Sequence, residues 1–123
     1  MAGLKLSSKA QKAMDTLQLV RRKVERVHSL VEQYCSARSA QDSMAQSLSR
    51  AAADVGRLLM NNGLGVMADS ANQVAMGAKR GGHTQAKYRQ LRELVGGLRV
   101  AIDRAEKNVL DAERQHEHDE AGH

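Results

Sequence analysis

The chain contains no proline, no phenylalanine and no tryptophan, and it has only two tyrosines among 123 residues. Because proline breaks helices, its absence allows long ones. Aromatic side chains supply much of the bulk of a thick layered core, so their scarcity favours thin helical packing through Ala, Val, Leu and Met. The alternating β-branched segments and tight turns that indicate strands are also missing. These absences predict an all-α protein.

Cysteine and long apolar segments are scarce too. The one cysteine, Cys35, cannot form a disulfide within the chain, and no neighbouring base suggests that it acts as a nucleophile. No apolar run approaches the roughly 20 residues that a membrane-spanning helix needs, and the first residues do not resemble a secretory signal. We therefore expect a cytoplasmic protein with a single domain.

Apolar residues recur at spacings of three and four along both halves of the chain. One line runs from Ala10 to Leu58 with Gln41 as a polar interruption, and a second runs from Met67 to Ala112. An average period near 3.5 residues is typical of a coiled-coil seam. The sequence therefore predicts two long amphipathic arms.

Residues 61–65 separate the two lines and read Asn-Asn-Gly-Leu-Gly, which suits a helix end and a turn. If the chain reverses here, the two lines face each other, and the numbers of facing residues add up to 125 or 126. This pattern predicts a long antiparallel helical hairpin. A single domain of residues 1–118 would contain arm one at about 8–60, the turn at 61–65 and arm two at about 66–118, before a disordered polar tail at 119–123.

Adjacent glycines weaken the second arm, because each glycine costs helix stability relative to alanine. At Gly81-Gly82 the arm either breaks into two helices, with Thr84 capping the second, or bends locally. Gly96-Gly97 is a second interruption, which we interpret as a kink or a close approach of a neighbouring helix.

A lone hairpin buries one narrow stripe, and several apolar side chains lie beside that stripe. Such residues form a face on which further helices can pack, so we expect assembly into a multi-helix bundle, either with itself or with a helical partner. The residues assigned to partner binding are Leu30, Leu59, Met60, Leu64, Val66, Leu94 and Leu110.

The net charge of +5 concentrates in the middle of the predicted hairpin. At the open end, the basic Lys9 and Lys12 would be balanced by the acidic end of arm two, including Asp111 and Glu113. The central belt is a candidate anion-binding surface for acidic protein, lipid head groups or nucleic acid, or simply a solvated face. Its residues are Arg21, Arg22, Lys23, Arg26, Lys79, Arg80, Lys87, Arg89, Arg92 and Arg99.

Residues with catalytic or metal-binding chemistry do not form a recognisable motif. No nucleophile, base and orienting group occur in a convincing combination, so we predict neither an enzyme, nor a cofactor, nor a small-molecule substrate. His116, His118 and His123 near the end of the chain are the weak candidates for a metal site, but they lack the spacing of a zinc motif.

These patterns favour a non-catalytic helical interaction protein, acting as a scaffold, an adaptor or a subunit of a larger complex. Its expected partner is a helical protein or a second copy of the chain. The alternative is a peripheral membrane- or nucleic-acid-binding module that works through the basic belt.

Overall fold

A computed structural model describes the backbone of residues 6–121 and the side chains of residues 6–115. Within this range the chain forms helices α1 (Ser8–Ser36), α2 (Gln41–Asn61), α3 (Gly65–Lys79) and α4 (Gln85–Ala121). The fold is all-α, as the sequence predicts. No helix in the described part is long and apolar enough to cross a membrane.

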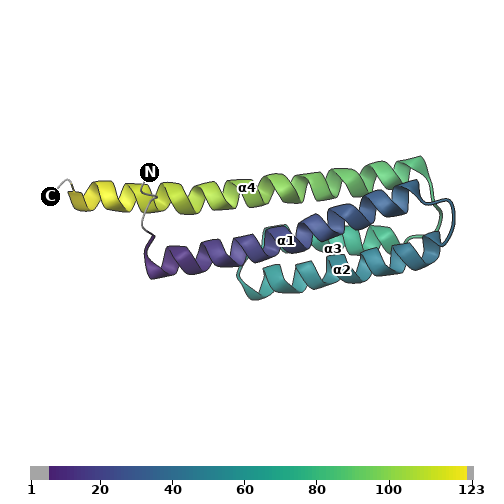
Figure 1. The fold of residues 1–123 in the computed structure, drawn as a ribbon, viewed down its shortest axis with the longest axis horizontal. Coiled ribbons are helices and arrows are strands. Elements are labelled where there is room, and N and C mark those ends of the chain that lie inside the picture. Colours follow the sequence, from purple (N-terminus) through teal and green to yellow (C-terminus); the bar gives the residue numbers. More distant parts are fainter. Residues whose placement is uncertain (1–5, 122–123) are drawn as a thin grey trace.

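The helices run alternately in opposite directions and lie side by side (Figure 1). Helix α1 packs against α2 and α4, and α3 packs against the same two helices. This arrangement is an up-down-up-down four-helix bundle. The single chain therefore supplies all four helices of a bundle.

Arm one is not the continuous helix that the sequence predicts for residues 8–60. Helix α1 ends at Ser36, the chain reverses over residues 37–40, and Ala40 adopts a left-handed conformation with φ of 58° before α2 begins. The prediction of one long arm is wrong because folding back lets α2 cover the face of α1 that a two-helix hairpin leaves in water. At the other end of the chain, α4 continues to Ala121, past the start of the expected polar tail, and residues 122–123 lie outside the described range.

The break predicted in arm two is present. Helix α3 ends at Lys79, and Gly82 has a φ of 86°, a conformation that glycine adopts without a steric penalty. The Thr84 hydroxyl then accepts a hydrogen bond of 3.2 Å from the Lys87 amide at the start of α4. Both chain reversals lie at the same end of the bundle (Figure 1).

Helices α2 and α3 pack through small side chains, which lets their backbones come close together. Gly56 on α2 faces the Asn72 side chain so closely that a Cβ atom there would lie 2.3 Å from its Oδ1. The buried Ser49 hydroxyl donates to the Ala75 carbonyl of α3 at 2.8 Å. The buried face of α3 consists of Met67, Ala68, Ala71, Val74, Ala75, Gly77 and Ala78.

Helices α1 and α4 pack through a row of branched aliphatic side chains bordered by ion pairs. Arg99 binds Glu25 at 2.8 Å, Arg92 binds Glu32 at 3.0 Å, and Arg21 binds Asp103 at 2.6 Å. In each pair the residue numbers add up to 124, close to the register in which the two apolar lines face each other. The buried row consists of Val20, Val24, Val27, Val31, Leu91, Val95, Leu98 and Ile102.

Two neighbouring residues at the end of α2 provide a test of how α2 packs in the bundle. Leu59 is 0% exposed and Met60 is 56% exposed, so we expect Leu59→Ala to lower the free energy of unfolding by about 2–5 kcal/mol through the cavity it leaves. Met60→Ala, the matched control, should change it by less than about 0.5 kcal/mol. Urea unfolding followed by circular dichroism measures both, and equal losses would contradict the packing of α2.

Candidate functional site

The helices of the bundle differ in length, and this difference creates an open groove. Helices α1 and α4 have 29 and 37 residues, whereas α2 and α3 have 21 and 15. Because all four meet at the end with the two reversals, α1 and α4 extend beyond the α2–α3 turn at the other end (Figure 1). We call this projecting part of α1 and α4 the stem.

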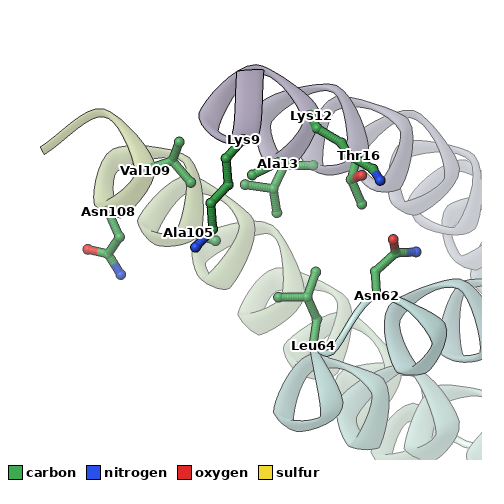
Figure 2. Close-up of a pocket in the computed structure, with 10 residues that line it drawn as sticks. Lys9, Lys12, Ala13, Thr16, Asn62, Leu64, Ala105, Asn108 and Val109 are labelled. Atoms are coloured by element: carbon green, nitrogen blue, oxygen red, sulfur yellow. The ribbon is translucent and has the colours of Figure 1, made fainter. Parts of the chain in front are cut away.

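A cleft of about 410 Å³ lies where the stem leaves the α2–α3 turn. Its apolar lining comes from Ala13, Leu17, Leu64, Ala105 and Val109, and therefore from α1, the turn and α4. Figure 2 shows Leu64 extending from the turn into the space between α1 and α4. A smaller hollow of about 280 Å³ continues along the stem and shares Lys9, Ala13 and Val109 with the cleft. Together they form one apolar groove between α1 and α4, which we call the stem groove.

Polar side chains border the stem groove. Lys9, Lys12 and Thr16 come from α1, and Asn62 and Asn108 come from the turn and α4. Lys9 extends from α1 toward α4 in Figure 2.

The acidic residues of α4 do not balance these lysines within the described side chains. Glu113 accepts a hydrogen bond from the Ser7 amide, and Asp111 lies 3.8 Å from Arg114. Among residues 6–115, neither Lys9 nor Lys12 forms an ion pair. The groove therefore has an apolar floor, with Lys9 and Lys12 along its α1 side and Glu113 on its α4 side.

The residues assigned to partner binding are dispersed by the fold. Leu64 lines the stem groove. Met60 in the last turn of α2 and Val66 in the first turn of α3 are 56% and 86% exposed, but neither lines the groove. Leu59, by contrast, is fully buried, so its assignment to a docking surface is wrong. The sequence places Leu58 in the apolar line, whereas in the structure Leu59 is the fully buried residue and Leu58 is partly buried against the same core. The buried face is wider because α2 packs against both α1 and α3.

The remaining three assigned residues lie elsewhere. Leu30 and Leu94 are partly buried against the core, at the level of the four-helix section. Leu110 is partly buried on the stem. Of the seven assigned residues, Leu64 is the one that lines the groove.

The predicted basic belt is divided among different roles. Arg21, Arg92 and Arg99 are bound to carboxylates across the α1–α4 interface. The hydrogen bond from Arg92 lowers the pKa of Glu32, and the hydrogen bonds of Arg21 to Glu106 and Asp103 raise the pKa of Arg21. Six residues of the belt are exposed and form no ion pair among residues 6–115: Arg22, Lys23, Arg26, Lys79, Arg80 and Arg89.

Lys87 serves the fold rather than an anion-binding surface. Its ammonium group is buried and donates to the carbonyl oxygens of Ala78, Arg80 and Gly82 at 3.1, 2.6 and 3.1 Å. It also lies 5.1 Å from the centre of the Tyr34 ring. Burial lowers the pKa of Lys87. Since these carbonyls belong to the end of α3 and the following connector, Lys87 ties the second reversal to α4.

A cluster of polar side chains joins the two reversals, and the sequence patterns did not reveal it. The ring nitrogens of His83 lie 2.6 Å from the Tyr34 hydroxyl and 2.9 Å from Asp42 Oδ1. Gln41 donates to the Tyr88 hydroxyl at 2.8 Å. The register in which residue numbers add up to 126 would place Gln85 opposite Gln41, but Gln85 is exposed. The sequence feature that could have indicated this cluster is the position of the two tyrosines, because Tyr34 lies just before the first chain reversal and Tyr88 just after the second.

An Asp-His-Tyr arrangement invites comparison with a catalytic triad, but the environment of the tyrosine opposes it. Tyr34 is fully buried, and burial raises its pKa to about 12, which makes the phenolate harder to form. Burial likewise raises the pKa of Cys35. The cluster is better suited to holding α1, α2 and the second connector together.

The candidate metal ligands His116, His118 and His123 lie outside the described side chains. Among the side chains of residues 6–115, no group of three His, Cys, Asp or Glu residues is placed to hold a metal ion. The lining of the stem groove contains lysines, amides, hydroxyls and the Glu113 carboxylate beside apolar side chains.

No family model matches the chain, and no curated protein or solved structure was found to be similar to it.

The buried Tyr34 makes stability depend on alkaline pH. Its pKa is raised from 10.0 to about 12 in the folded state, so the native protein holds the phenol proton more tightly than the unfolded chain. The stabilisation is complete below pH 10 and is lost as the pH rises through the folded pKa. Between these values we expect the free energy of unfolding to fall by up to about 2 kcal/mol more in the wild type than in Tyr34→Phe.

Urea unfolding at a series of pH values measures this difference. Tyr88→Phe is the matched control, because it removes a phenol from the same cluster while leaving Tyr34 in place, and it should retain the alkaline loss. Parallel pH profiles for the wild type and Tyr34→Phe would show that the Tyr34 phenol is not buried as described.

Proposed function

We propose that the protein is a non-catalytic helical interaction protein whose stem groove binds an acidic amphipathic helix of a partner. The observation that supports this proposal most strongly is the continuity of the groove. Along the four-helix section, the α1–α4 pair is covered by α2 and α3, and at Leu64 that cover ends while the pair continues. A surface that packs helices in one part of the molecule has the shape to pack another helix in the next.

The lysines beside the groove favour the binding of an acidic helix over a basic one. Lys9 and Lys12 border it without an ionic partner among residues 6–115. A helix with carboxylates beside its apolar stripe would satisfy these ammonium groups and cover the apolar floor. Complementary charge favours the correct partner and speeds its association.

Designed peptides provide the test. The first peptide is a helix of about four turns with a leucine stripe flanked by glutamates, and the second carries lysines in place of the glutamates. We expect the glutamate peptide to bind with an affinity at least about tenfold higher, measured by fluorescence anisotropy at low salt. Lys9→Glu with Lys12→Glu should reverse this preference.

The matched control is Arg22→Glu with Lys23→Glu, which makes the same change of charge on exposed α1 residues outside the groove lining. It should leave the peptide preference intact. Equal binding of both peptides, or no binding by either, would contradict the proposal. If the control variant instead loses binding to vesicles containing phosphatidylserine or to duplex DNA, the alternative function through the basic belt gains support.

A further inference from the structure

We propose that the chain also forms a domain-swapped dimer in which both connectors straighten. In this dimer α1 and α2 become one helix, and α3 and α4 become another. The α1–α4 half of each copy then packs against the α2–α3 half of the other. The partner is therefore a second copy of this chain, and the surface it uses is the interface between the two halves of the monomer.

The path of the chain permits this exchange without unthreading. The two halves are connected only through residues 37–40 and 80–84, because the α2–α3 turn lies within one half. Both connectors lie at the same end of the bundle (Figure 1). Opening that end like a hinge therefore separates the α1–α4 pair from the α2–α3 pair while each pair remains intact.

The polar contacts are distributed in the way that such an exchange requires. The ion pairs of Arg21, Arg92 and Arg99 all lie within the α1–α4 half. The hydrogen bond from Ser49 to Ala75 lies within the α2–α3 half. Opening the hinge leaves these bonds in place, and the contacts of α1 with α2 and of α3 with α4 re-form between copies. Exchange of identical elements in this way needs no new interface.

The first connector favours the straight form. Ala40 has a positive φ of 58°, a conformation that is strained for a residue with a Cβ atom. Residues 37–40 read Ala-Arg-Ser-Ala, which contains neither glycine nor proline, and the line of apolar residues continues past them from Tyr34 to Met44 with Gln41 as its interruption. A continuous helix would relieve the strain at Ala40.

The second connector and the polar cluster favour the closed monomer. Gly81 and Gly82 would weaken a continuous helix, and Gly82 adopts its φ of 86° without a steric penalty. The bonds from Gln41 to Tyr88 and from Lys87 to Ala78 join the two halves, and His83 of the connector bonds to Asp42 at the start of α2. The equilibrium between monomer and dimer therefore depends on both connectors, and each connector can be mutated separately.

Two opposite variants test this balance. Gly81→Ala with Gly82→Ala strengthens the straight form and strains the closed one, so we expect the dimer association constant to rise by at least about tenfold. Ala40→Gly relieves the strain in the closed form, so we expect it to lower the dimer fraction below that of the wild type. Light scattering after size-exclusion chromatography measures both. If the glycine variant does not fold, wild-type protein refolded at about 1 mM serves as the dimer sample.

A distance measurement distinguishes exchange from simple docking. Spin labels are attached at Arg22→Cys and Arg57→Cys in a Cys35→Ser background, and labelled chains are diluted with unlabelled ones. In the closed form α1 and α2 are neighbouring antiparallel helices, and we expect labels within about 30 Å. In the swapped dimer, 35 residues of one helix separate the labels by about 50 Å at ~1.5 Å per residue. A dimer with the short distance, or the absence of any dimer in a folded sample, would overturn the proposal.

Discussion

The packing of α1 against both α2 and α4 is the interaction on which the rest of the structure depends. For α2 to reach α1, the chain must reverse at residues 37–40, and for α4 to reach α1 it must reverse again at 80–84. The protein has few large side chains with which to fill a thick core. Folding back solves this difficulty, because four helices bury valine, leucine and alanine from several sides, whereas a two-helix hairpin would bury a single stripe.

The same interaction gives the molecule its two surfaces of functional interest. At the end with the reversals, the polar groups of Tyr34, Asp42 and His83 meet because three segments converge there. At the other end, α2 and α3 stop short and leave the α1–α4 pair uncovered beyond Leu64. The convergence of segments at one end and the open groove at the other end therefore belong to one arrangement, in which two long helices are packed against two short ones.

Much of the helical structure could be predicted from the sequence, because apolar spacing and glycine act locally. The all-α class, the turn near Gly63 and the break at Gly81-Gly82 all follow from such signals. The reversal at residues 37–40 could not be predicted in this way. Its residues are compatible with a helix, and the chain reverses there because burial elsewhere outweighs local preference. The left-handed Ala40 is the visible sign of that conflict.

The site was harder to predict than the fold, since it depends on where helices end relative to one another. Leu64 was assigned to a binding surface by its place beside the turn, and in the structure it lines the stem groove. Leu59 is buried instead, because a helix with two neighbours has a wider buried face. Lys9 and Lys12 were expected to be balanced by α4, and in the described part they are not. Only the folded-back arrangement reveals that they border an open groove.

Small-angle X-ray scattering of the monomer tests the folded-back arrangement most directly. With α4 as the longest element, the bundle should have a maximum dimension of about 60 Å, from 37 residues at ~1.5 Å each and their side chains. A continuous hairpin with arms of more than 50 residues would give a thin rod of about 80 Å. A monomer with the shorter dimension agrees with the four-helix bundle, and a monomeric rod of the longer dimension would contradict it.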